Sequence, residues 1–212
     1  MLGTMFDNLI LNFDQALRAL AAAPAHALPP AAAAGAIPEP ALDADERSRA
    51  AALMRVNHSG EVCAQALYHG QALMAKTASV RAHMQKAAED EGAHLAWTAT
   101  RIRALGGHRS LLNPLWYAGS FALGAFAARL GDPVSLGFVA ETERQVEVHL
   151  DDQIARLPAA DHESRAVLEV MREDEIRHAR DARLAGGVSL PWPARLAMRA
   201  AGKVMTTTAY YL

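Results

Sequence analysis

The chain of 212 residues is 51% hydrophobic and carries a formal net charge of −2, so it can bury the core of one domain and gives no electrostatic reason to expect nucleic acid as a partner. Its single cysteine, Cys63, excludes an intramolecular disulfide and suits a reducing cytoplasm. The first 22 residues contain Asp7 and Asp14 and lack a basic start, so we expect no secretory signal.

The N-terminal part divides into a helix and a linker. Apolar residues at helical spacing predict an amphipathic helix over residues 4–21. Residues 22–42 are rich in alanine and contain five prolines, which predicts a linker or a loose strap. We therefore expect residues 1–42 to form an attachment and residues 43–212 to form the folded domain.

Two long helices are predicted first in this domain. Residues 45–75 lack proline and place Glu61 as the only acid in the interior of an apolar face, where an unpaired carboxylate is costly. After a break at residues 77–79, a second helix carries Glu91 and His94 on its inward face. It ends at Gly106-Gly107.

Two more helices follow a segment without charged residues. We expect Asp132 to cap the third helix, with a proline at the first helical position and Glu143 on the core face. A turn at residues 158–161 precedes the fourth helix. This helix places Glu175 and His178 inward and stops at a Gly-Gly pair, residues 186–187.

A repeated motif connects the second and fourth helices. Glu-Asp-Glu-x-x-His occurs at residues 89–94 and again at residues 173–178. A Glu and a His three positions apart share one face of a helix. Four-helix bundles that hold two iron or manganese ions use a Glu-x-x-His from each of two helices and a Glu from each of the others. One isolated motif is usually a solvated face, but two copies inside apolar helices favour a metal site.

The spacing of the acids supports this interpretation, because residues at the same depth in an antiparallel hairpin are equally far from its turn. The midpoint of Glu61 and Glu91 falls beside the first break, and the midpoint of Glu143 and Glu175 falls inside the second turn. Each pair lies roughly 22 Å from its turn, at about 1.5 Å per residue. We therefore predict six metal ligands: Glu61, Glu91, His94, Glu143, Glu175 and His178.

Residues around these ligands have expected supporting roles. We expect Asp90 and Asp174 each to accept the second ring proton of the opposite motif's histidine, although ordinary surface charge is the alternative. His58 and His149 are expected to form hydrogen bonds, and Cys63 to be a small buried apolar group. Mixed carboxylate and imidazole ligands favour iron or manganese.

Residues 111–128 are long and apolar enough to be a borderline membrane span. A crossing would separate the ligands of the two hairpins, so we expect this segment to lie along the bundle or in the membrane interface. Trp116 and Tyr117 would then lie at head-group level. The alternative is a buried crossover helix without lipid contact.

The C-terminal helix carries a basic stripe of Arg195, Arg199 and Lys203. Such a stripe suits anionic lipid head groups or a plain solvated face. Together with the apolar segment, it favours peripheral association with the cytoplasmic face of the cell membrane.

The residues also carry a family resemblance. The run from Met54 to Glu61 (Met-Arg-Val-Asn-His-Ser-Gly-Glu), the two Glu-x-x-His motifs, the stretch from Glu143 to His149 and the apolar connector resemble the demethoxyubiquinone hydroxylase family. The resemblance runs from about residue 45 to the end. Mitochondrial members have a tyrosine directly after the position of His149, where this chain has Leu150, so no tyrosine is available there for a redox role.

The resemblance implies an all-α, ferritin-like four-helix bundle with an added apolar connector helix and terminal amphipathic helices. It also implies a di-iron monooxygenase of ubiquinone biosynthesis that hydroxylates the ring of a polyprenylated methoxy-methyl-benzoquinol. All six ligand positions of the family are filled here, with His149 as a further residue near the ligands. The expected cofactor is two iron ions per chain, with manganese as an alternative. The expected partners are the quinol, dioxygen, an electron donor and a membrane surface.

Two other classes of function remain open. A ferritin-like protein that stores iron or destroys peroxide needs no lipid-facing segment, so residues 111–128 argue against it. A non-catalytic scaffold in a membrane complex does not need six ligands. The slightly acidic composition disfavours a hydroxylase that acts on RNA. The prenyl tail length, the electron donor and homo-oligomer formation are left open.

Overall fold

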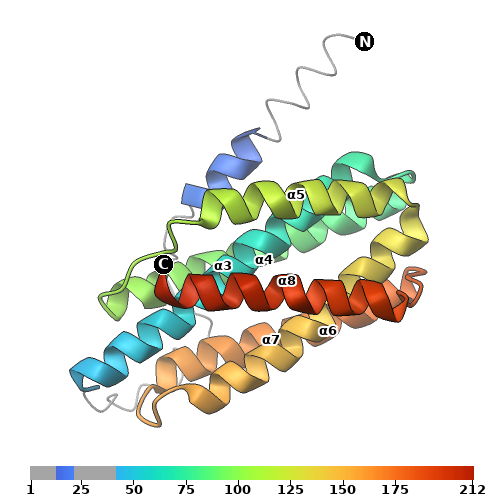
Figure 1. Ribbon diagram of the computed structural model, residues 1–212. Helices are drawn as coiled ribbons and strands as arrows, with labels where there is room; N and C mark the ends of the chain where they lie inside the picture. The colour runs from blue at the N-terminus through green and yellow to red at the C-terminus, as the bar shows by residue number, and fades with distance from the viewer. Residues whose placement is uncertain (1–12, 22–41) are drawn as a thin grey trace.

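The computed structural model describes residues 13–21 and 42–212, and these form helices joined by short connections (Figure 1). Besides a short helix at residues 13–21, the elements are α3 (Ala44–Met74), α4 (Ala78–Ala104), α5 (Asn113–Arg129), α6 (Asp132–Arg156), α7 (His162–Leu184) and α8 (Trp192–Tyr211). The all-α prediction is therefore confirmed for this part of the chain. Residues 1–12 and the linker at 22–41 lie outside the described residues, so the proposed division at residue 42 stays a prediction.

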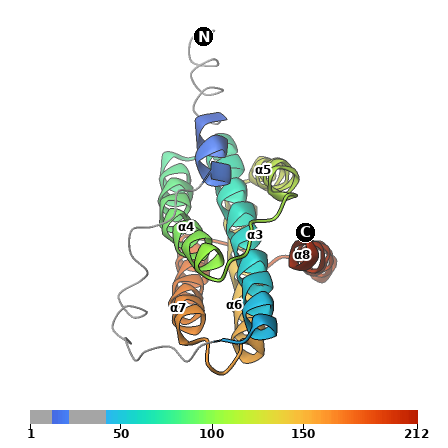
Figure 2. The ribbon, with the colours of Figure 1, turned by 90° about the vertical axis from the view of Figure 1, so that its left-hand side faces the viewer.

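Four of these helices form a bundle built from two antiparallel hairpins, α3–α4 and α6–α7 (Figure 2). Apolar residues from all four helices meet in its core, among them Leu53, Ile102, Leu150 and Leu168. This is the ferritin-like arrangement that the sequence predicts. The bundle brings Glu61 of α3 and the Glu-x-x-His motifs of α4 and α7 into one interior.

Side chains and glycines satisfy or terminate the helix ends. Asp43 accepts a hydrogen bond from the backbone N–H of Glu46 at 2.8 Å, and the Glu46 carboxylate accepts one from Asp43 at 3.1 Å, which forms a capping box. Asp161 caps α7 by accepting from Ser164 N at 2.9 Å. The connections after α4 and α7 contain Gly106 and Gly186 at φ 73° and 107°, a conformation that glycine adopts without steric cost.

Asp132 does not cap its own helix, which corrects the sequence-based expectation. Gly131 occupies the N-cap position of α6, and the Asp132 carboxylate turns to the connection between α3 and α4 instead. It accepts hydrogen bonds from the backbone N–H of Lys76 and of Thr77, each at 2.9 Å, and from the Thr77 hydroxyl at 2.8 Å. Satisfying three donors of a neighbouring turn outweighs satisfying one donor of its own helix.

The connector helix α5 runs parallel to α3 and lies directly on it. Asn113 accepts from the Ser59 hydroxyl at 2.8 Å near the start of α5, and Gly124 near its end lies on the backbone of α3. A Cβ atom at Gly124 would lie 2.2 Å from the carbonyl oxygen of Leu67, and one at Gly70 would lie 2.2 Å from that of Phe121. The two glycines therefore permit backbone-to-backbone contact between the helices.

Replacing Gly124 with alanine is expected to destabilise the fold by about 1–3 kcal/mol, because α3 and α5 must move apart to admit the methyl group. The matched control is Gly119→Ala on the same helix, where a Cβ atom meets nothing within 4 Å. Urea unfolding of both variants checks this. A G124A variant as stable as G119A would contradict the close contact.

The position of α5 confirms that residues 111–128 lie along the bundle. No helix among the described residues combines the length and the apolar character needed to cross a membrane. Tyr117 corrects part of the prediction, because it is buried against Val62 and Ala66 of α3 and hydrogen-bonds the His69 ring at 2.8 Å. It is therefore not available to lipid head groups.

The last helix, α8, lies on the bundle surface on the same side as α5 (Figure 2). Its end is held by Arg55, which donates to the carbonyl oxygen of Ala209 at 2.8 Å and to that of Tyr210. Most of the helix, including Arg195, Arg199 and Lys203, is exposed. Helices α5 and α8 thus cover one side of the bundle, while α4 and α7 form the opposite side.

Candidate metal centre

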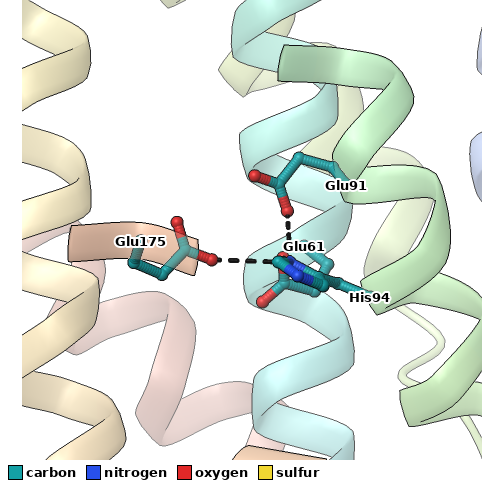
Figure 3. Close-up of side chains that lie close together, drawn as sticks. All are labelled: Glu61, Glu91, His94 and Glu175. Carbon is teal, nitrogen blue, oxygen red and sulfur yellow. Dashed lines mark hydrogen bonds and ion pairs between the residues drawn. The ribbon is translucent and has the colours of Figure 1, made fainter. Parts of the chain in front are cut away.

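The predicted ligands from three bundle helices meet in the interior. Glu61 of α3, Glu91 and His94 of α4, and Glu175 of α7 each offer one ligand atom, and these atoms all lie within 4.8 Å of one another (Figure 3). All four side chains are buried. Burying three carboxylates together is costly unless protons or a cation neutralise their charge. Their arrangement is therefore that of a group that can hold a metal ion.

The two nitrogens of His94 face different partners. Nδ1 lies 2.9 Å from Glu91, 3.5 Å from Glu175 and 3.6 Å from Glu61, so it points into the carboxylate group. Nε2 lies 3.0 Å from the Asp174 carboxylate of the opposite motif. A ring held at Nε2 by a carboxylate presents Nδ1 as the free donor atom for a metal.

His178 repeats this geometry from the other side. Its Nδ1 lies 3.3 Å from Glu91 and 3.6 Å from Glu175, and its Nε2 lies 3.7 Å from Asp90. Each motif's aspartate therefore faces the other motif's histidine, but only Asp174 lies within hydrogen-bond distance of its histidine. The roles of Asp90 and Asp174 in metal binding stay a prediction.

Glu143 joins the group from α6 through a residue whose role the sequence analysis missed. The buried Tyr68 hydroxyl donates a short hydrogen bond to the Glu143 carboxylate, which also interacts with Glu175. Tyr68 lies seven residues after Glu61, two turns along the same inward face of α3. That spacing, together with a hydroxyl on an otherwise apolar face, is the sequence feature that could have indicated a role for Tyr68 near the ligands.

Unpaired atoms concentrate at these residues. Among the described residues, eleven buried side-chain nitrogen and oxygen atoms have no hydrogen-bond partner, and five of them belong to predicted ligands: Glu91 Oε1, Glu143 Oε2, Glu175 Oε2, and Nδ1 and Nε2 of His178. Buried polar atoms are normally satisfied, so such a concentration indicates a missing partner common to them all. Metal cations fit this set of carboxylate and imidazole donors.

The pKa values show how the group is charged without a cation. Burial, with the neighbouring carboxylates, raises the pKa of Glu61 and of Glu143 well above the ordinary range. Burial opposes the charged form of His178, but Glu175 and Glu91 outweigh it and raise its pKa to about 11. The pKa of His94 is also raised against the effect of burial, mainly by Glu91. Protons therefore supply the positive charge that a metal would bring.

Metal binding is consequently expected to release protons at pH 7. The pKa of His178 is raised to about 11, and the pKa values of Glu61, Glu143 and His94 are raised as well, so a metal competes with protons for these groups. The apparent affinity for metal should thus increase as the pH rises. Calorimetric titrations with a divalent metal, in buffers of different ionisation enthalpy, measure the protons released; binding without proton release would contradict this charge arrangement.

Three further residues considered in the sequence, His149, His58 and Cys63, make contacts outside the group of Figure 3. His149 Nε2 accepts a hydrogen bond from the Gln153 side-chain amide at 3.0 Å, and His58 Nδ1 hydrogen-bonds the Thr98 hydroxyl at 3.0 Å, so both form the hydrogen bonds that were expected. A place for His149 beside the metal ligands stays a prediction. Cys63 is half-buried rather than buried, and its thiol interacts with Ser120 of α5.

Comparison with known proteins agrees with the site. The profile of the family described as "Ubiquinone biosynthesis protein COQ7" matches residues 48–209. The chain belongs to the COQ7 family. Proteins named 3-demethoxyubiquinol 3-hydroxylase from Burkholderia mallei (strain SAVP1) and Burkholderia pseudomallei (strain 668) are each 57% identical to it over 211 residues. A relative of the same name from Burkholderia thailandensis is 56% identical. Each alignment covers 98% of this chain and 100% of the relative.

Membership of the COQ7 family confirms the resemblance that the motifs carry. The matched region of this COQ7-family chain begins inside α3 and includes all six predicted ligands. It also includes α5 and most of α8. The helix at residues 13–21 lies before the family match, although the relatives align with nearly the whole chain.

Proposed function

We propose that this COQ7-family protein is a 3-demethoxyubiquinol 3-hydroxylase that works with two iron ions held by Glu61, Glu91, His94, Glu143, Glu175 and His178. The observation that carries the proposal is the buried group of Glu61, Glu91, His94 and Glu175, completed by Glu143 and His178. The names of the relatives give the substrate, a demethoxyubiquinol, and the type of reaction. Neither an iron-storage role nor a scaffold role is favoured by these relatives.

Hydroxylation replaces a ring hydrogen with a hydroxyl group from dioxygen, and the second oxygen atom leaves as water after uptake of two electrons and two protons. Iron, when bound, supplies the redox chemistry that activates dioxygen. The protein's own residues position the ligands: Asp174 and Asp90 face the outer nitrogens of the two histidines, and Tyr68 holds Glu143. The apolar core around them excludes bulk water.

The quinol ring is proposed to approach between α3 and α6. Apolar residues of these helices, among them Ala64, Leu67 and Val139, line a seam that reaches Glu143. The seam is too narrow for a water molecule in this structure, so it must widen to admit a ring. Leu67 also lies against Gly124 of α5, which places the seam on the side covered by the connector helix.

The experiment that tests the function combines metal content with turnover. The protein is reconstituted with ferrous iron, its iron content is measured, and a short-tailed demethoxyubiquinol is offered under ¹⁸O₂ with a chemical reductant. The expected result is close to two irons per chain and a hydroxylated quinol that carries ¹⁸O. Iron binding with peroxide consumption but no hydroxylated product would favour the storage or peroxidase alternative, and a folded protein without metal affinity would favour the scaffold.

Peripheral membrane binding through the α5 side is the second part of the proposal. Leu115 and Phe126 of α5 are 62% and 60% exposed, and the basic residues of α8 lie on the same side of the bundle. Exposed apolar side chains beside basic ones suit a lipid interface. The prenyl tail of a quinol in the bilayer would then reach the protein on the side where the α3–α6 seam lies.

The variant Leu115→Glu/Phe126→Glu is expected to bind anionic liposomes at least about tenfold more weakly, since each apolar side chain contributes roughly 1.5–3 kcal/mol when buried. The control is Leu184→Glu, an even more exposed leucine on α7 at the opposite side. Liposome flotation measures both. Equal loss of binding in the two variants would show that α5 is not the lipid-facing helix.

A further inference from the structure

A second way to the ligands lies on the side of the bundle away from α5 and α8. Between α4 and α7 there is a cavity of about 310 Å³, with Tyr68 of α3 and Val139 of α6 also among the residues that line it. Helices α4 and α7 pack against each other much less than α3 packs against α4, which leaves this space open. Figure 2 shows α4 and α7 on the side opposite to α5 and α8.

Several side chains that can bind metal line this cavity, next to apolar ones such as Ala87 and Leu184. His83, Asp90, His178 and Asp181 all line it. The charge of Asp181 raises the pKa of His83 and His178 lowers it, so the three groups are electrostatic neighbours. Burial is the larger effect and lowers the pKa of His83, which keeps its imidazole neutral and able to bind a cation at pH 7.

His178 connects the cavity with the metal centre. Its side chain is more than nine-tenths buried, it lines the cavity, and neither of its ring nitrogens has a hydrogen-bond partner. Its Nε2 lies 3.7 Å from Asp90, also in the lining, and its Nδ1 lies 3.3 Å from Glu91 inside the centre. His178 therefore belongs both to the cavity lining and to the centre, and it joins the two.

The charges of the cavity lining favour a cation over an anion. The two basic residues of the lining are already paired, Lys86 with Asp90 and Arg177 with Asp174. Behind them lie the four buried glutamates of the centre. The carboxylate and imidazole groups of the lining can bind a cation, whereas an anion would find both basic residues already paired.

We propose that the α4–α7 cavity is the route by which divalent metal ions reach the centre, with His83 and Asp181 as a transient docking site and His178 as the step from the cavity to Glu91. This inference rests on the proposed dinuclear site. It assigns the two sides of the bundle to different reactants: the lipid-soluble quinol on the α5 side, and the hydrated cation on the α4–α7 side.

The test measures the rate of metal uptake rather than turnover. The metal-free full chain is mixed with Co²⁺ in a stopped-flow instrument, and the visible absorption of cobalt bound by imidazole and carboxylate is followed. The test variant is His83→Gln/Asp181→Asn. The control, His108→Gln/Asp152→Asn, removes an exposed imidazole and an exposed carboxylate outside the cavity. Like Asp181, Asp152 forms a surface ion pair with an arginine of its own helix.

The expected result is uptake about tenfold slower in the test variant than in the control, with the same final absorption and cobalt content. Lys86→Gln, which removes the cation paired with Asp90, should accelerate uptake. Equal rates in test and control variants would overturn the route while leaving the metal centre intact. A lower final cobalt content in the test variant would also overturn it, because the residues would then belong to the centre. A wild-type chain that binds no cobalt would overturn the proposed function as well.

Discussion

Replacing Glu175 with alanine is expected to abolish stable iron binding and to reduce quinol hydroxylation by at least about 100-fold, the upper range for residues that only orient a ligand. Glu175 is 1% exposed and lies within reach of both histidines, at 3.5 Å from His94 Nδ1 and 3.6 Å from His178 Nδ1. Losing it removes a carboxylate that faces both halves of the centre. Iron analysis after gel filtration and a hydroxylation assay measure the two effects together.

The matched control is Glu169→Ala, which removes an exposed glutamate of the same helix. It should retain iron and activity. Retention of two irons and of activity in E175A would sink the assignment of Glu175 as a ligand. Loss of helix content in E175A, measured by circular dichroism, would show that the loss of iron followed from unfolding instead.

The second large effect is expected for Asp174→Ala, which should weaken metal binding by about 10- to 100-fold while leaving all six ligands in place. The Asp174 carboxylate lies 3.0 Å from His94 Nε2, within hydrogen-bond distance of it. Without it, the ring loses the partner that fixes its tautomer and orientation. Competition against a metal chelator measures the change in affinity.

Asp151→Ala provides the control, because Asp151 pairs with Arg172 much as Asp174 pairs with Arg177 but has no histidine beside it. An affinity in D174A equal to that in D151A would show that the aspartate serves only its arginine.

The helices and the level of the ligands were predictable because both follow from local rules. Hydrophobic periodicity fixes which face of each helix is buried, and an antiparallel hairpin fixes which residues share a depth. Glu61 and Glu91 thus meet in the structure as their equal distance from the first turn predicts. The repeated Glu-Asp-Glu-x-x-His motif supplied the remaining pairs, including the aspartates that face the opposite histidines.

The contacts that depend on tertiary packing were not predictable from the same rules. The sequence pattern around Asp132 is that of an N-cap, and only the neighbouring turn reveals stronger partners for its carboxylate. The sequence around Tyr117 is typical of an aromatic residue at a membrane interface. Only the packing of α5 on α3 shows that its ring is buried. Periodicity placed Tyr68 inward, but its bond to Glu143 requires the relative position of two helices that are distant in sequence.

The three hydrogen bonds accepted by Asp132 also fix the position of the second hairpin relative to the first. They join the turn of the first hairpin to the first residue of the second hairpin, eleven residues before Glu143 and about 16 Å from it along α6. A slip of one residue along α6 would shift Glu143 by about 1.5 Å and rotate it by roughly 100° about the helix axis, out of the group. Hydrogen bonds at the far end of α6 thus hold Glu143 at the depth of the other predicted ligands.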